Sequence, residues 1–409
     1  MTQSPEGTTA KVERTPLDKR LRVVFVDHVA RLSGGEIAMR RLLPALATHV
    51  DVHVVLGEDG PLVEQLGALG IDTEVMPLPP RLRDVRKGTV RPDLLDPIAV
   101  AYLPRYALRL SRRIRALDAD IVHANSLKAA LYAGLAARLA RVPAVWHIRD
   151  RIAADYLPTS AVILVRTASR ILPTAIVANS LTTLETLPLP RHGRVVYNPV
   201  VYDGVEQVGP LPTRVADEMT VGIVGRLAPW KGQHVFLDGF AEAFRGTHVR
   251  GRIIGSALFG EEEYASSLSR QAERLGISSQ IDFRGFRADV WEELSKLDVL
   301  VHCSVTPEPF GQVVLEGMAA GLPVIATAAG GPAELITGGV DGILTRPGDA
   351  GELAAALRRV QGDPDLRRQL GAAAQRRSNE FTPERAAQQL LGVYLEILGQ
   401  KRQGLGGRP

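Results

Sequence analysis

Short, nearly continuous apolar stretches recur along the 409-residue chain, and segments with a helical spacing of apolar residues lie between them. Strands that lack an apolar–polar alternation are typical of parallel sheets whose two faces are both covered by helices. The repeated order of strand, loop and helix therefore predicts parallel βαβ units. In the first half of the chain, the expected strands are Arg22–Asp27, Val52–Leu56, Asp120–Ala124, Ala144–Ile148, Ile176–Ala178 and Arg194–Tyr197, with a helix expected over Glu36–Ala47.

This pattern stops near Val201 and starts again at Thr220. The residues between them, 201–218, contain two Gly and two Pro and show no clear period, which is typical of an interdomain linker. A second series of strands then follows, with helices between them. These expected strands are Thr220–Gly225, Arg252–Ile254, Gln280–Phe283, Val299–His302 and Pro323–Ala326.

The two series predict an α/β fold of two doubly wound, Rossmann-like domains that face a cleft. Ligands of open α/β sheets bind outside the carboxyl ends of the strands, so two substrates could meet there. We expect the first domain over 20–200, the second over 219–381 and a disordered tail over 1–19. A helix is expected over 382–400, because apolar residues recur there at helical spacing. Such a helix needs an apolar surface, and the first domain is one candidate.

The composition is that of a soluble globular protein, with 45% apolar and 23% charged residues. The single cysteine, Cys303, allows no disulfide within the chain and is expected to be a buried small hydrophobe. No stretch reaches the length of a membrane span, and the first twenty residues lack the apolar core of a secretory signal. We therefore expect a cytoplasmic protein.

One stretch, Arg81–Arg115, carries an excess of positive charge, with ten Lys or Arg and three Asp. Two interpretations stay open for it. It could dock on an anionic lipid surface or acceptor, which would place the protein at the inner face of the membrane. It could equally be a solvated helix face in an arginine-rich chain.

The segment from Glu308, EPFGQVVLEGMAAGLPVIATAAGGPAEL, follows directly on an expected strand. Gly311 ends a turn there, and a helix is expected to begin near Gln312. The unpaired N–H groups of such a helix start form an anion site, and a glycine lets a phosphate oxygen approach the backbone. Two carboxylates, Glu308 and Glu316, flank the turn and suit sugar or ribose hydroxyls. Taken alone, the first could be a surface acid and the second a helix-start acid.

A second motif, GRLAPWKGQHVFLDGF, begins at Gly225. Arg226 leaves the end of the first strand of the second series, and Lys231 lies at the start of the next helix. Cations are disfavoured at a helix N-terminus, so two of them around one such turn indicate a bound anion. The alternative is that both are surface charges.

Together, GRLAPWKG and EPFGQVVLEGMAAGLPVIATAAGG resemble the donor-domain signature of the retaining glycosyltransferases of family 4, also called glycosyl transferases group 1, which have the GT-B fold. The family pattern is a Glu, seven residues and a second Glu, which here are Glu308 and Glu316. The resemblance extends from about Leu21 to Leu398 and is strongest in the second half. It is specific for the family and not for the substrate.

The resemblance implies a role for each matching residue. In the second domain, Arg226 and Lys231 would hold the diphosphate of a nucleotide-sugar donor. Glu308 would contact sugar hydroxyls and Glu316 would bind the ribose. The backbone of three further residues would line the phosphate and sugar site, namely Phe310, Gly311 and Gln312.

In the first domain, the resemblance implies that the Gly34-Gly35 loop approaches the phosphates from across the cleft. The alternative for this pair is a tight βα turn. His147, at the end of an expected strand, would point into the cleft near the reacting centre, although a lone strand histidine is often a structural residue. Ile148-Arg149 departs from the commonest family sequence, which leaves the acceptor contacts open.

Motifs of other enzyme classes are absent from the sequence. The first strand is followed by SGGE and not by a spaced G-x-G-x-x-G, there is no Walker motif, and no His/Cys cluster has metal-ligand spacing. We expect a metal-independent enzyme that needs no cofactor besides its nucleotide-sugar co-substrate and binds no nucleic acid. It would move a sugar, with retention, to an acceptor hydroxyl in envelope polysaccharide, glycolipid or natural-product glycoside synthesis. The alternatives are a sugar-nucleotide epimerase of the same fold and a non-catalytic partner protein.

Overall fold

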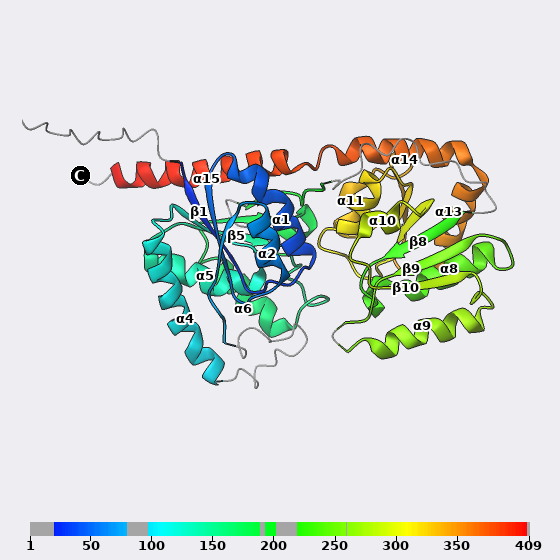
Figure 1. Ribbon diagram of the computed structural model, residues 1–409, viewed down its shortest axis with the longest axis horizontal. Helices are drawn as coiled ribbons and strands as arrows, with labels where there is room; N and C mark the ends of the chain where they lie inside the picture. The colour runs from blue at the N-terminus through cyan, green and yellow to red at the C-terminus, as the bar shows by residue number, and fades with distance from the viewer. Residues whose placement is uncertain (1–19, 80–96, 189–192, 202–218, 259, 407–409) are drawn as a thin grey trace, which may run out of the picture.

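Two lobes, each built on a parallel sheet, make up the computed structural model in Figure 1. The structure describes residues 20–79, 97–188, 193–201, 219–258 and 260–406. The expected tail 1–19 lies outside these residues, as do most of the expected linker and the first part of the basic stretch. The prediction of two doubly wound α/β domains is confirmed.

The first lobe has a seven-stranded parallel sheet in the order β3-β2-β1-β4-β5-β6-β7. β1 lies at its centre and pairs with β2 and β4. The strands are β1 (Arg22–Asp27), β2 (Asp51–Leu56), β3 (Asp72–Val75), β4 (Ile121–Ala124), β5 (Ala144–Ile148), β6 (Ala175–Ala178) and β7 (Gly193–Val195). The helices are α1 (Gly34–Ala47), α2 (Pro61–Ala68), α4 (Pro97–Ala116), α5 (Leu127–Ala140), α6 (Thr159–Ser169) and α7 (Leu181–Glu185).

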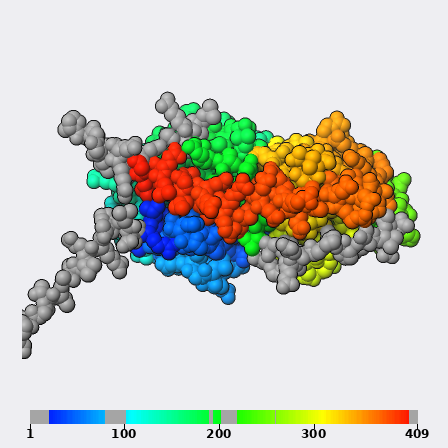
Figure 2. Space-filling view, turned by 90° about the horizontal axis from the view of Figure 1, so that it is seen from above, coloured from blue at the N-terminus to red at the C-terminus, as the bar shows by residue number. Residues whose placement is uncertain are grey.

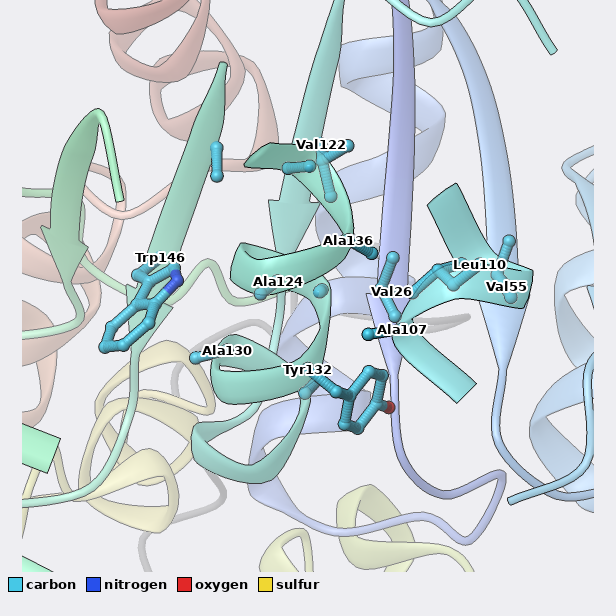
Figure 3. Packing of buried hydrophobic residues seen from close by; sticks show 14 of the residues in the cluster. Val26, Val55, Ala107, Leu110, Val122, Ala124, Ala130, Tyr132, Ala136 and Trp146 are labelled. Carbon is cyan, nitrogen blue, oxygen red and sulfur yellow. The ribbon is translucent and has the colours of Figure 1, made fainter. Parts of the chain in front are cut away.

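The continuous apolar character of β1 follows from burial on both faces. Val23 and Phe25 belong to the core cluster that contains α1. Val24 and Val26 point to the other face and pack with α4 and α5 (Figure 3). Small residues let α5 lie close to this face: a Cβ atom added to Gly134 would stand 2.8 Å from the Trp146 indole nitrogen.

The second lobe has a six-stranded parallel sheet in the order β10-β9-β8-β11-β12-β13. Its strands are β8 (Thr220–Val224), β9 (Arg250–Ile254), β10 (Ile281–Gly285), β11 (Val299–His302), β12 (Val324–Thr327) and β13 (Ile343–Thr345). The helices are α8 (Gln233–Phe244), α9 (Glu262–Arg274), α10 (Val290–Leu294), α11 (Gln312–Ala319), α12 (Pro332–Leu335), α13 (Ala350–Gly362) and α14 (Pro364–Ser378), and a short 3-10 turn, η3 (Pro229–Lys231), precedes α8.

The last helix, α15 (Pro383–Gly406), leaves the second lobe and packs on the first. Figures 1 and 2 show α14 and α15 running along one side of both lobes. Leu390 and Tyr394 of α15 are fully buried in the same cluster as α1 and β1. The expectation that the C-terminal helix finds its apolar surface on the first domain is therefore confirmed.

Several boundaries differ from the predicted ones. The edge strands β3 and β13 were not predicted, because they are short and only partly buried and so carry little apolar signal. β7 ends at Val195 and not at Tyr197. α1 begins at Gly34 and not at Glu36, because Ser33 is its N-cap and Glu36 completes a capping box with it. None of the described helices is both long and apolar enough to cross a membrane.

Candidate active site

Glu308, on the loop between β11 and α11, is a buried carboxylate with several polar partners. It is 5% exposed and forms an ion pair with Lys231. The same carboxylate oxygen, Oε1, lies 3.0 Å from His302 Nε2 and accepts a hydrogen bond of 2.5 Å from the Ser304 hydroxyl. Burial alone would raise the pKa of Glu308, but the charges of Lys231 and then His302 hold that pKa well below its usual range. Glu308 is therefore a carboxylate at neutral pH.

The turn after Glu308 has the conformation that the glycine predicts. Gly311 has φ 88° and is the N-cap residue of α11. The Gly331 N–H donates to the Glu308 carbonyl at 2.9 Å, and a Cβ atom added to Gly331 would stand 2.3 Å from the Phe310 Cα. The loop is thus packed directly against the backbone after β12. The Phe310 side chain is buried, with its ring centre 6.2 Å from that of Tyr197.

The two predicted cations lie on the same turn, after β8. The guanidinium carbon of Arg226 and the Lys231 ammonium are 5.7 Å and 4.6 Å from the centre of the Trp230 ring. Arg226 Nε also lies 3.3 Å from a carboxylate oxygen of Glu261. Gly232 follows with φ 73°, and a Cβ atom there would stand 1.9 Å from the Cys303 carbonyl oxygen. The turn is therefore pressed against the end of β11, which brings Lys231 to Glu308.

Glu316, the second glutamate of the motif, has a partner that the sequence did not reveal. It is buried on α11, and its Oε1 lies 2.8 Å from Nη1 of Arg41, a residue of α1 in the first lobe. Burial raises the pKa of Glu316, although the charge of Arg41 opposes that rise. Glu316, which was expected to bind the ribose, is thus part of a buried ion pair between the lobes. Arg41 lies within a predicted helix, and no pattern distinguishes it from a surface arginine.

Further contacts between the lobes gather on the loop that carries Glu308. The hydroxyls of Ser180, the N-cap of α7, and of Thr183, within α7, donate to the Pro309 carbonyl at 2.5 Å and 3.2 Å. Glu334 of α12 accepts hydrogen bonds of 2.8 Å and 2.7 Å from the N–H groups of Leu181 and Thr182. The segments after β6 and after β11 therefore meet at the carboxyl ends of the two sheets.

Arg149, directly after β5, links the first lobe to the start of α11. Its Nε donates to Asn125 at 3.1 Å, and its Nη1 donates to the Asn198 side-chain oxygen. Asn198 Nδ2 in turn donates to Gln312 Oε1 at 3.2 Å, at the first residue of α11. Arg149 is 9% exposed, and burial lowers its pKa to about 10. The sequence singled out this position only as a departure from the family pattern.

The structure places Gly34 and Gly35 as the first two residues of α1 and not in a loop before it. A Cβ atom on Gly35 would stand 3.2 Å from Cδ of Arg149, whereas one on Gly34 would meet nothing within 4 Å. The helix start that they form thus lies over Arg149. The expectation that this pair forms a loop before the helix was wrong, because the capping box begins the helix earlier, and its approach to the phosphates stays a prediction.

His147 lies inside the first lobe, with 1% of its surface exposed. Its Nδ1 is 3.2 Å from His123 Nε2 and 3.3 Å from Nη2 of Arg149. Burial, with the charge of Arg149, lowers the pKa of His147 well below its usual value. The imidazole is therefore neutral at physiological pH. Cys303 is buried, as expected, and burial raises the pKa of its thiol.

The groups that could hold an anion in this region are Arg226, Lys231 and the N–H groups at the start of α11. In the part of the chain that the structure describes, no group of three or more His, Cys, Asp or Glu side chains could hold a metal ion. The arrangement suits a ligand that combines a diphosphate with hydroxyl groups, because cations and carboxylates alternate along it.

Comparison with known proteins supports this interpretation. The model of the "Glycosyl transferases group 1" family matches residues 212–377, and that of "Glycosyltransferase Family 4" matches residues 32–203. The chain belongs to this family of GT-B glycosyltransferases. The resemblance found in the sequence is thereby confirmed.

Solved structures of the family share the whole fold. The crystal structure of Anabaena Alr3699/HepE in complex with UDP is 27% identical, with a TM-score of 0.77 over 91% of this chain and 99% of that one. A second structure of the same protein contains UDP-glucose. Sucrose-phosphate synthase from Thermosynechococcus elongatus, at 19% identity, TM-score 0.73 and coverage of 93% of this chain and 100% of that one, has the same fold.

Curated relatives match over shorter regions. The lipopolysaccharide core biosynthesis glycosyltransferase LpsE of Rhizobium meliloti is 30% identical over 46% of this chain and 51% of its own length. A D-inositol 3-phosphate glycosyltransferase of Corynebacterium urealyticum is 32% identical over 45% of this chain and 44% of its own length. The match thus spans about half the length of these relatives.

Proposed function

We propose that the protein transfers a sugar from a nucleoside diphosphate sugar to an acceptor hydroxyl, with retention at the anomeric carbon. The observation that carries the proposal is the cluster of Lys231, Glu308 and Arg226 at the carboxyl end of the second sheet, opposite the first lobe. The relation to Anabaena HepE, whose structures hold UDP and UDP-glucose, favours a donor that contains a uridine nucleotide.

The second lobe would hold the donor. Arg226 and Lys231 bind the diphosphate, together with the backbone N–H groups at Gly311 and Gln312. Glu308 is held ionised by Lys231, and its second oxygen accepts from a sugar hydroxyl. Between the diphosphate and this carboxylate, Lys231 neutralises the repulsion that two anions would otherwise have.

Glu316 would bind the ribose hydroxyls. Its carboxylate already contacts Arg41. The arriving ribose therefore either shares this carboxylate with Arg41 or displaces Arg41 from it. In both cases the donor contacts a group that ties the two lobes together. Donor binding is then coupled to the position of the first lobe, which carries the acceptor.

Catalysis would rest on positioning and on stabilisation of the leaving diphosphate by the two cations and the helix start. The β-phosphate accepts the proton of the acceptor hydroxyl, as is argued for this family. Glu308 then needs no role as a nucleophile, which agrees with its engagement by Lys231, His302 and Ser304. Because two side-chain cations meet the diphosphate, we propose that transfer needs no metal ion.

Peripheral membrane contact is a separate part of the proposal. Of the basic stretch, the structure describes the side chains from Tyr102 onward, and Arg105, Arg109 and Arg112 are exposed on α4. Tyr102 and Leu108 are 41% exposed on the same helix. Apolar residues among exposed arginines suit an anionic lipid surface. Co-sedimentation with anionic vesicles is expected to fall as salt rises, and equal binding to neutral vesicles would contradict this contact.

The proposed reaction is tested by a thermal-shift screen against UDP-, GDP- and dTDP-sugars, followed by a transfer assay with the donor that binds. A ligand that binds only the folded state raises the melting temperature. Transfer to an acceptor with a retained anomeric configuration, unaffected by EDTA, is the expected result. Conversion of the donor sugar without an acceptor would instead indicate an epimerase, and binding without turnover a non-catalytic protein.

A further inference from the structure

A row of buried polar side chains crosses the first lobe from α15 to the candidate site. It consists of Tyr394 in α15, His123 in β4, His147 in β5 and Arg149 directly after β5. Tyr394 and His123 are fully buried, and the other two are at most 9% exposed. Burying polar groups is costly unless they hydrogen-bond one another, so each member of such a row needs a partner with the right donor or acceptor.

The side chains in the row contact one another in sequence. The Tyr394 hydroxyl lies 2.8 Å from His123 Nδ1, and His123 Nε2 lies 3.2 Å from His147 Nδ1. Nη2 of Arg149 lies 3.3 Å from the same nitrogen of His147. The far end of Arg149 contacts Asn198, which binds Gln312 at the start of α11. The row therefore connects the C-terminal helix with the donor lobe.

The positions of the protons follow from Arg149. A guanidinium group has only donors, so His147 Nδ1 must accept. The same Nδ1 faces His123 Nε2, and that nitrogen must therefore carry the proton of His123. Burial, followed by the charge of Arg149, lowers the pKa of His123 to about 3, so its ring is neutral and its Nδ1 is an acceptor. The Tyr394 hydroxyl, whose pKa burial raises well above its usual value, donates to it.

These assignments leave His147 with one proton, on Nε2. Nδ1 is already occupied by two donors, so it cannot remove a proton from a substrate. Nε2–H is fully buried and meets no hydrogen-bond acceptor among the described residues. With the opposite tautomer, N–H groups of His147 and Arg149 would face each other, which costs free energy. Arg149 at one end of the row and Tyr394 at the other therefore favour the same arrangement of protons on the two histidines.

We propose that Tyr394 and Arg149 are positioning residues that hold His147 as a neutral Nε2–H donor for an oxygen atom of the bound substrate. The inference rests on the proposed function and deepens it, because it gives the first-lobe histidine the role of hydrogen-bond donor and not of general base. It also assigns a part in the reaction to a residue of the C-terminal helix.

The direct test is the tautomeric state of both histidines in the full chain, measured by nitrogen-15 NMR with labelled histidine at pH 7 and without ligand. We expect both rings to be neutral with the proton on Nε2. A charged His147 ring, or a proton on its Nδ1, would overturn the proposal. Because this measurement needs no turnover, its outcome is independent of whether the proposed transfer reaction is correct.

Kinetics of His147→Gln then separate a donor from a base. Glutamine keeps an N–H donor, so we expect kcat to fall no more than about tenfold. A general base would lose about 100-fold or more on the same change. A loss of that size would overturn the donor role.

Tyr394→Phe removes only the hydroxyl group and keeps the buried ring. We expect an approximately tenfold lower kcat at unchanged donor KM, because His123 loses the partner that holds its ring. The matched control is Tyr106→Phe, since the Tyr106 hydroxyl also makes a buried hydrogen bond, of 2.8 Å to the Met76 carbonyl. The control should lose stability without losing kcat. Equal kcat effects of the two variants would reduce Tyr394 to a structural residue and contradict the proposal.

Discussion

The two lobes hold buried charge in different ways. In the second lobe, the Glu308 carboxylate contacts the ammonium group of Lys231, and both belong to motifs that are recognisable in the sequence. In the first lobe, the Arg149 guanidinium donates to three neutral side chains, those of Asn125, Asn198 and His147. A charged pair whose two members belong to recognisable motifs can be found from the sequence. A charge that is held by a network of distant residues becomes visible only in the fold.

This difference also concerns function. The second-lobe pair presents a cation beside an anion, as a ligand with both phosphate and hydroxyl groups requires. The first-lobe network presents donors that are oriented by neutral partners, which suits an uncharged acceptor. We therefore expect substitutions in the second lobe to affect donor handling and rate strongly, and those in the first lobe to affect pH dependence and coupling between the lobes.

The largest effect is expected from the cations. Arg226→Ala and Lys231→Ala should each lower the transfer rate by about 100-fold or more, because the leaving diphosphate loses a charged partner. Steady-state kinetics with the donor from the thermal-shift screen measure this. Lys296→Ala is the control, since that lysine pairs with Glu292 near the surface and away from the turn. Turnover of both variants at the wild-type rate would refute the assignment.

A change of stability with pH should mark the first lobe. Burial, and then the charge of Asp27, raises the pKa of Glu36 to about 7. The folded state therefore binds a proton that the unfolded state releases above about pH 4.5, so this stabilising contribution is complete below pH 4.5 and lost as pH rises to 7.

Glu36→Gln should remove that loss, since glutamine is neutral and still completes the capping box with Ser33. Urea unfolding at pH 5 and pH 8 should show that the variant gains about 3 kcal/mol relative to wild type at the higher pH. If the two proteins differ in free energy of unfolding by the same amount at both pH values, Glu36 is ionised throughout.

The two glutamates of the motif should divide the donor between them. Glu316→Gln is expected to weaken binding of the free nucleoside diphosphate and of the donor, because both contain ribose. Glu308→Gln should leave the free nucleotide nearly unaffected and depress transfer. Hydrogen bonds to charged groups contribute about 1.5–3 kcal/mol, which calorimetry resolves. Equal losses of nucleotide affinity in the two variants would show that the division is wrong.

Arg41→Met should have the smallest of these effects, but the direction in which nucleotide affinity changes with pH is clear. Without the guanidinium, the pKa of the buried Glu316 rises further, because only the hydrogen bond with Gln312 then opposes the effect of burial. Nucleotide affinity should fall most at low pH and recover as the pH rises and the carboxylate forms. Calorimetric titration at several pH values measures this recovery. An affinity loss that does not change with pH would mean that Arg41 contacts the nucleotide itself.

The sequence predicted the architecture because parallel strands buried on both faces are continuously apolar. Thus β1, β5 and β11 have the predicted bounds, whereas the half-exposed edge strands β3 and β13 were missed. The donor turn was predicted because Gly311 lies between an expected strand and an expected helix and is flanked by Glu308 and Glu316, and Gly311 indeed has a positive φ. Arg41 and Arg149 were not assigned roles, since neither lies in a recognisable motif and no spacing rule connects them with Glu316, Asn125 or Asn198.

The crossing of α15 onto the first lobe has a consequence for synthesis of the chain. The core that α1 and β1 begin is completed by Leu390 and Tyr394 of α15, which are synthesised long after the strands of the first lobe. At ribosomal rates of about 5–20 residues per second, the first lobe waits on the order of ten seconds or more with this apolar face uncovered. It must be shielded during that interval, and a chain released early would leave the ribosome with its first half exposed to aggregation.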